Sequence, residues 1–82
     1  MITSSTEISS KQDALEAWDQ KTVIVRDDED YVYVYPCLGR GVSYLGFDLR
    51  RECTLMGFLR VDQAVYWAQS RGYKPVVLKG VV

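Results

Sequence analysis

The chain has 82 residues, of which 48% are hydrophobic and 26% are charged, which is the composition of one folded domain and not of a disordered segment. It has no histidine and only two cysteines, which excludes histidine-dependent nucleophiles, histidine zinc sites and a disulfide scaffold. The net charge of −1 is uneven, with eight of the 11 acidic residues in residues 1–30 and seven of the 10 basic ones in residues 31–82, so the two halves either neutralise each other or present a basic patch to an acidic partner.

Residues 1–8 are polar and have little to bury, so the sequence predicts a flexible N-terminal tail followed by a single domain over residues 9–82. The first residues have neither the basic start nor the apolar core of a signal peptide, and no apolar run approaches the ~20 residues that cross a bilayer. We therefore expect a cytoplasmic protein without a membrane partner. In that compartment Cys37 and Cys53 are expected to be structural thiols, with a disulfide bridge or a reactive thiol as the alternatives.

A helix is predicted over about residues 9–19, because each of two consecutive serines is followed three residues later by a side chain that can complete an N-terminal cap. Its apolar residues Ala14, Leu15 and Trp18 are spaced three and four apart and share one face. Trp18 is expected to anchor this helix to the rest of the domain.

The clearest periodic signal is the alternation of tyrosine and valine over residues 31–35, which predicts a strand with two different faces. The β-branched residues 22–26 predict a preceding strand, and the four acidic residues 27–30 predict a solvated loop between the two. A loop of that length places Val25 opposite Val32, and this register assigns every side chain of the hairpin to a face. The valine face holds Val23, Val25, Val32 and Val34 and is expected to face the helices. The tyrosine face holds Thr22, Ile24, Arg26, Tyr31, Tyr33 and Tyr35, and its tyrosines are expected to face away from the helices and to be exposed.

After the hairpin, Pro36 is expected to end the strand, and residues 37–41 are expected to form a glycine-containing loop. Alternation over residues 42–49 predicts a further strand, with a turn at residues 50–51. Residues 53–59 fit either a fourth strand or a helical turn.

A second helix is predicted from the N-cap residue Asp62 to Arg71, with Gly72 as a left-handed C-terminal cap. A last strand is expected over residues 76–82, after Pro75, which suits the beginning or the edge of a strand. The order of helix, four strands, helix and strand predicts an α+β fold. The expected architecture is a two-layer sandwich, in which a mostly antiparallel sheet of four to five strands carries two helices packed on one face.

No segment carries the residues of a catalytic, metal or cofactor site, so we expect a protein that is not an enzyme and uses no cofactor. The acidic residues 27–30 lack the spacing and the glycine of a calcium-binding loop. The segment Gly39, Arg40 and Gly41 has the glycines of a phosphate loop but lacks its lysine, and no helix is predicted directly after it.

One stretch of the chain carries a family resemblance: it runs from Val23-Ile24-Val25 through the acidic turn to residues 31–35, Pro36-Cys37-Leu38 and Gly41-Val42-Ser43. This stretch resembles the first hairpin of HicB-type antitoxins, which implies an antitoxin-like regulator as an alternative function. The resemblance covers about a quarter of the chain. In that family a helix follows soon after the glycine, whereas this sequence predicts another hairpin there, so no family is assigned.

The tyrosine face is the predicted interaction surface, because tyrosines provide a large contact area at low entropic cost. We expect a small non-enzymatic protein-interaction domain, a regulator or inhibitor of a larger protein, which also forms a homodimer. The predicted interaction residues are Ile24, Arg26, Tyr31, Tyr33, Tyr35 and Arg40. One alternative is an ordinary half-exposed sheet face. The other is a nucleic-acid-binding module that stacks bases on the tyrosines and contacts phosphates with the C-terminal arginines.

Overall fold

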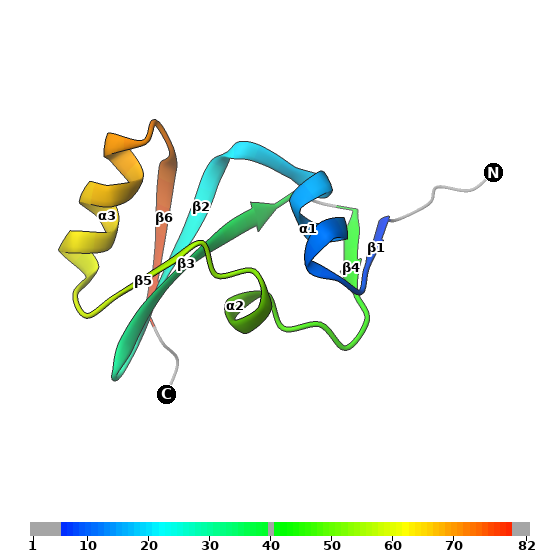
Figure 1. Ribbon diagram of the computed structural model, residues 1–82, viewed down its shortest axis with the longest axis horizontal. Helices are drawn as coiled ribbons and strands as arrows, with labels where there is room; N and C mark the ends of the chain where they lie inside the picture. The colour runs from blue at the N-terminus through cyan, green and yellow to red at the C-terminus, as the bar shows by residue number, and fades with distance from the viewer. Residues whose placement is uncertain (1–5, 40, 80–82) are drawn as a thin grey trace.

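Two sheets and three helices make up the part of the chain that the computed structural model describes, which is residues 6–39 and 41–79 (Figure 1). In chain order the elements are β1 (Thr6–Ile8), α1 (Lys11–Ala17), β2 (Trp18–Asp28), β3 (Tyr31–Leu38), β4 (Val42–Tyr44), α2 (Leu49–Glu52), β5 (Met56–Phe58), α3 (Val61–Ser70) and β6 (Lys74–Lys79). The larger sheet has the strand order β5-β3-β2-β6, and β1 and β4 form a separate parallel pair. The predicted α+β class is therefore confirmed, and the larger sheet is mixed because β6 runs parallel to β2.

The predicted hairpin is present, but its loop is shorter than expected. β2 continues to Asp28 and β3 begins at Tyr31, so residues 29–30 alone form the turn. Two-residue turns are common in hairpins because their backbone twist matches that of the paired strands. The register differs by two positions from the predicted one, with Arg26 opposite Tyr33. A shift of two leaves every side chain on the face predicted for it.

The valine face forms the main hydrophobic core, and the prediction that it faces a helix is confirmed. Val23, Val25, Val32 and Val34 are almost completely buried. Ala64 and Ala68 of α3 pack against them, and their small side chains allow a close approach of the helix to the sheet. The partly buried residues around this core are Trp18, Leu55, Phe58, Val61, Trp67 and Tyr73. In Figure 1, α3 lies beside β6 along this part of the sheet.

Four aromatic rings form a continuous row at the border of the main core. The ring centroids of Trp18 and Tyr73 are 5.5 Å apart, those of Tyr73 and Trp67 5.8 Å, and those of Trp67 and Phe58 5.9 Å. All three pairs are tilted, an arrangement that aromatic quadrupoles favour. The row therefore ties the beginning of β2 and the strand β5 to α3 and to the segment that follows it.

The ends of α3 follow ordinary capping rules, with one difference from the prediction. The N-cap residue is Arg60, so Asp62 lies inside the first turn, where a carboxylate suits the positive end of the helix. The carboxylate of Asp62 also pairs with Arg60 at 3.2 Å. Gly72 adopts φ +82° as predicted, and the N–H of Tyr73 donates to the carbonyl oxygen of Ala68 at 2.9 Å. This is the hydrogen bond of a glycine-terminated helix.

A second, smaller core forms where β1, β4, α1 and α2 meet. In Figure 1, β1, β4 and α1 lie on the right-hand side and α2 lies near the centre. Ile8, Ala14 and Cys53 are fully buried in this core. Its partly buried members are Ala17, Leu38, Val42, Phe47 and Leu49. Since α3 packs on the valine face and α1 belongs to this second core, the expected placement of two helices on one face is not confirmed. Residues 6–8 of the predicted flexible tail form the strand β1. Residues 1–5 lie outside the described residues.

The segment after the hairpin differs most from its prediction. β3 continues through Pro36 to Leu38, and Pro36 lies two positions beyond the last residue that pairs with β5, where a missing N–H removes no bond to that strand. The strand expected over residues 42–49 ends already at Tyr44. Gly46 adopts φ +67°, a conformation that turns the chain out of the strand.

A short helix replaces the turn that was predicted after this strand. Asp48 is the N-cap of α2, and its carboxylate accepts the N–H of Arg50 at 3.1 Å. Glu52 accepts the N–H of Asp48 at 3.4 Å, so the cap is closed from both sides. Of the two alternatives for residues 53–59, the strand is correct, because β5 pairs with β3 there.

Candidate interaction groove

Five of the six predicted interaction residues share the tyrosine face of the larger sheet. Ile24 and Arg26 belong to β2, and Tyr31, Tyr33 and Tyr35 belong to β3. The strand register brings Arg26 opposite Tyr33 and Ile24 opposite Tyr35. The sixth predicted residue, Arg40, lies outside the described residues.

The tyrosine row is not uniformly exposed, contrary to expectation. Tyr31 is 39% exposed, Tyr33 is half-buried, and Tyr35 is only 7% exposed. The rings of Tyr31 and Tyr33 meet edge to face with centroids 5.1 Å apart. The ring of Tyr31 also covers Gly57 of β5, where a Cβ atom would overlap it. At one end of the row Tyr31 and Tyr33 pack against each other, and at the other end Tyr35 is covered by the rest of the chain.

Tyr35, at the covered end of the row, lines a groove of about 570 Å³. Its sheet side is lined by Ile24, Arg26, Tyr35, Cys37 and Leu78, with Pro36 and Leu38 at the end of β3. Its opposite side is lined by Tyr44, Phe47, Asp48, Leu49 and Arg50. The second set comes from the end of β4, the connection after it and α2, so a segment predicted as a plain strand instead forms the wall of a groove.

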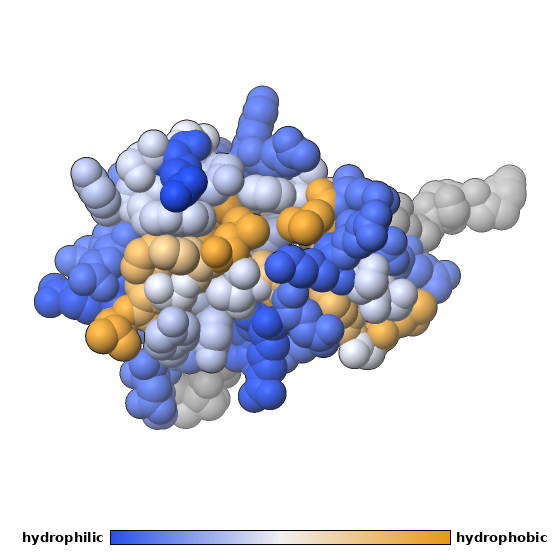
Figure 2. All heavy atoms as spheres, in the orientation of Figure 1, coloured by the Kyte–Doolittle hydropathy of each residue, from blue (hydrophilic) through white to orange (hydrophobic). Residues whose placement is uncertain are grey.

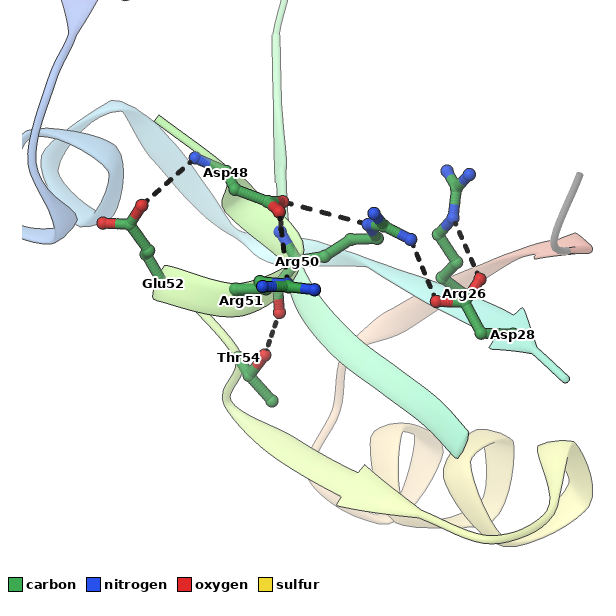
Figure 3. Close-up of polar contacts among 7 residues, drawn as sticks. All are labelled: Arg26, Asp28, Asp48, Arg50, Arg51, Glu52 and Thr54. Carbon is green, nitrogen blue, oxygen red and sulfur yellow. Dashed lines mark hydrogen bonds and ion pairs between the residues drawn. The ribbon is translucent and has the colours of Figure 1, made fainter. Parts of the chain in front are cut away.

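Two arginines that line the groove, Arg26 and Arg50, also approach Asp28, which lies next to the groove (Figure 3). Arg50 Nη1 donates to Asp28 Oδ2 at 2.9 Å, whereas Arg26 Nε lies 3.6 Å from Asp28 Oδ1. The longer distance exceeds hydrogen-bond range. Arg26 Nε is buried and has no hydrogen-bond partner among the described residues. The Arg26 side chain as a whole is 25% exposed and lines the groove, so an incoming acceptor can approach it from there.

The ion pairs continue from Arg50 along α2, as Figure 3 shows. The carboxylate of Asp48 lies 3.8 Å from Arg50 Nε and 3.7 Å from Arg51 Nε. We call Arg26, Asp28, Asp48, Arg50 and Arg51 the Arg–Asp network. Of this network Arg26, Arg50 and Asp48 line the groove, where two cations face one anion, so the lining favours a negatively charged group.

The phenol of Tyr44 stands at the rim of the groove near Cys37. Partial burial raises the pKa of Tyr44, and the neighbouring Cys37 and Tyr35 raise it further. The phenol therefore stays protonated at neutral pH and is available as a hydrogen-bond donor. Cys37 is a free, half-buried thiol in the groove, whereas Cys53 is a free thiol buried in the second core. The groove thus combines apolar contact area with hydroxyl and guanidinium donors, which is the chemistry of an amphipathic ligand site.

The wall of the groove and Leu78 are the residues that sequence reasoning missed. The alternation of residues 42–49 predicts a single strand, and this pattern does not reveal the turn at Gly46. One signal was available, because Asp48 is a favoured N-cap residue directly before the helical tetrad of α2. Leu78 carried no such signal, since its place depends on the parallel pairing of β6 with β2.

Comparison with protein-family models, with curated proteins and with solved structures finds no match for this chain. The likeness to HicB-type antitoxins therefore remains a resemblance of one hairpin. Within the described ranges, no helix is long and apolar enough to span a membrane. In the same ranges, no three histidine, cysteine, aspartate or glutamate side chains come together in a way that could hold a metal ion.

Proposed function

We propose that this protein is a small non-enzymatic interaction domain, which binds a larger protein through the groove and regulates or inhibits it. The observation that carries the proposal is the composition of the groove, where aromatic and aliphatic side chains lie beside Arg26, Asp48 and Arg50 of the Arg–Asp network. Tyrosine and arginine in a partly desolvated pocket are the side chains that contribute most to protein recognition. The predicted residues Ile24, Arg26 and Tyr35 take part in it directly, while Tyr31 and Tyr33 support it from the neighbouring part of the face.

The groove favours a partner segment that presents an apolar side chain next to a carboxylate. The apolar side chain would lie against Ile24, Phe47 and Leu78, and the carboxylate would pair with the guanidinium of Arg26, whose side chain lines the groove. An ionised acceptor there would make a charge-assisted hydrogen bond, about twice as strong as a neutral one. This proposal also gives a role to the basic C-terminal part of the chain, because Arg50 and Arg51 supply two of the three cations of the network.

Photo-crosslinking tests the groove directly, with a matched control on another surface. A photoreactive phenylalanine analogue replaces Tyr44, which is 49% exposed at the groove, or Tyr66, which is 75% exposed on α3. In cells of the native host, we expect the probe at position 44 to form a discrete adduct with one protein, and the probe at position 66 to form none. The adduct should disappear when Arg26→Met is added, because the carboxylate then loses its donor.

Two results would contradict the proposal. Identical adducts from both positions would mean that the groove has no preference for a partner. Adducts of nucleic acid in place of protein would favour the base-stacking alternative, for which binding to oligonucleotides should also fall steeply with salt.

A further inference from the structure

The strand β6 forms one edge of the larger sheet and exposes apolar residues on both of its faces. Val76, Val77 and Leu78 are 37%, 44% and 40% exposed. β6 pairs with β2 on one side, and within the described residues no strand lies on its other side. Natural edge strands are usually short, charged or covered, because an open apolar edge pairs with other chains. Here the charged residues, Lys74 and Lys79, stand only at the two ends.

Pro75 indicates which backbone groups of β6 face outward. Proline has no N–H to donate, so in a paired strand it belongs at a position whose N–H points away from the neighbouring strand. With Pro75 in that orientation, the N–H and C=O groups of Val77 and Lys79 also point outward, because the direction alternates along a strand. The outer edge of β6 then offers the donors and acceptors of Val77 and Lys79 together with the acceptor of Pro75.

We propose that β6 pairs in antiparallel fashion with β6 of a second copy of this chain, about a two-fold axis at Val77. In this register Val77 faces Val77 of the second copy, and Val76 faces Leu78. Each exposed apolar residue of the strand thus meets another apolar residue. Lys79 faces Pro75, so the N–H of Lys79 finds the proline carbonyl and the missing N–H of proline is not required.

The charges select this register over its neighbour. A slip of one residue, which puts Val76 opposite Val77, brings Lys74 opposite Lys79 at both ends of the pairing. Like charges directly opposite each other are unfavourable. The slip also places an outward-facing residue opposite an inward-facing one, which breaks the hydrogen-bond alternation of an antiparallel pair. The lysines at the ends therefore align the two strands rather than keep them apart.

The proposed interface shares only Leu78 with the lining of the groove and extends the sheet beyond it. A two-fold axis through an antiparallel pair stands perpendicular to the sheet, so the tyrosine faces of both copies lie on the same side of one continuous sheet. A single pair of short strands buries less than the ~1,600 Å² of a standard interface. We therefore expect a weak, concentration-dependent dimer with a dissociation constant on the order of 10 to 100 µM.

Sedimentation equilibrium of variants that introduce a charge at position 77 tests this register. Val77→Lys places two like charges at the two-fold axis and should weaken self-association at least about tenfold. The control Leu59→Lys makes the same change at an exposed residue outside β6 and should leave it unchanged. A mixture of Val77→Lys and Val77→Glu should restore dimers, since only these two variants place opposite charges face to face.

Amide hydrogen exchange on the wild-type protein gives a second readout that needs no substitution. The amides of Val77 and Lys79 should become more protected as the protein concentration rises, while exposed amides of α3 stay unchanged. The proposal is overturned if the wild type stays monomeric at about ten times the upper expected dissociation constant. It is overturned equally if Val77→Lys dimerises as well as the wild type, or if protection at Val77 and Lys79 is independent of concentration.

Discussion

Arg26 is the residue whose surroundings say most about function. Its Nε is buried and lacks a hydrogen bond, although the carboxylate of Asp28 lies 3.6 Å away. Asp28 already accepts a shorter bond from Arg50. A side chain that served stability alone would be expected to satisfy its buried donor within the fold.

Replacing Arg26 should therefore affect binding more than folding. Arg26→Met keeps the length of the side chain and removes the unsatisfied donor, so the free energy of unfolding should change by less than about 1 kcal/mol. Arg50→Met removes a 2.9 Å bond to Asp28 and should lower it by about 1 kcal/mol or more. Urea denaturation measures both. An equal loss in the two variants would mean that Arg26 is a structural residue.

The two thiols should differ in reactivity. Cys37 is half-buried in the groove, whereas burial raises the pKa of Cys53 and reduces its thiolate fraction. With a disulfide reagent at pH 8, one thiol per chain should react quickly in the folded protein and both should react in urea. Cys37→Ser should remove the fast phase, and equal rates for the two thiols would contradict this assignment.

At the scale of elements, the junction of α1 and β2 explains why Trp18 is not helical. The N–H groups of Lys21 and Thr22 donate to the same carboxylate oxygen of Asp19, both at 2.8 Å, and Gln20 adopts φ +62°. This local loop interrupts the pairing of β2 with β3 after Trp18. It turns the indole back so that its N–H donates to the carbonyl oxygen of Thr22 at 2.6 Å.

This junction should make the stability of the fold depend on pH. The backbone N–H of Thr22 lowers the pKa of Asp19, and the N–H of Lys21 lowers it further, below the usual value of 3.8. A lowered pKa means that the ionised carboxylate stabilises the fold above pH 3.8 and that this effect is lost as pH falls through the folded-state pKa. Asp19→Asn should melt at a lower temperature than the wild type at pH 7, and the difference should shrink below pH 3.8. A constant difference would show that the charge is not involved.

Trp18 itself anchors β2 to the main core, where a helical anchor was predicted. Trp18→Ala should lower the free energy of unfolding by about 2–4 kcal/mol, because it removes both the indole hydrogen bond and the contact with Tyr73. Trp18→Phe keeps a ring and should retain more than half of this stability. Chemical denaturation followed by tyrosine fluorescence or circular dichroism measures both variants. An unchanged midpoint in Trp18→Ala would place the indole outside the core.

The alternation of residues 31–35 was enough to predict the face on which each side chain lies, because a two-residue change of register preserves faces. It did not predict that Tyr35 is buried. The capping residues Ser10 and Gly72 were also readable, since the hydroxyl of Ser10 accepts the N–H of Asp13 and Gly72 ends α3. The groove could not be predicted from the sequence. It depends on α2 and β6, whose positions follow from long-range packing rather than from local pattern.

At the scale of the whole molecule, the two hydrophobic cores differ in size and should differ in stability. The main core holds the four valines and α3, whereas Ile8, Ala14 and Cys53 are the fully buried residues of the second. Figure 2 shows apolar residues gathered between α3 and the sheet, and a separate apolar area at the right-hand end of the molecule. Few buried apolar contacts allow a region to open without global unfolding.

Hydrogen exchange in the native state should detect this difference. Amides in the β1–β4 pairing should exchange through local openings of lower free energy than those in the β2–β3 hairpin, because the smaller core supports them. Ile8→Ala should lower the protection of β1 and β4 while the centre of β2 keeps most of its own. Equal protection throughout would mean that the two cores unfold as a single unit.

The parallel pairing of β2 with β6 has a consequence for the time course of folding. β2 and β3 are neighbours in the chain and can pair early. The other edge of β2 pairs with β6, which follows β5 and α3 in the chain. Closing that long segment carries an entropic penalty before any ladder bond forms, and such distant pairings slow folding. During synthesis, this edge of β2 stays unpaired until the chain has been extended to Lys79. The turn at Gly72 connects α3 to β6. Substitutions in this turn should therefore prolong the time during which the edge of β2 is unpaired, even where the groove of the folded protein is unchanged.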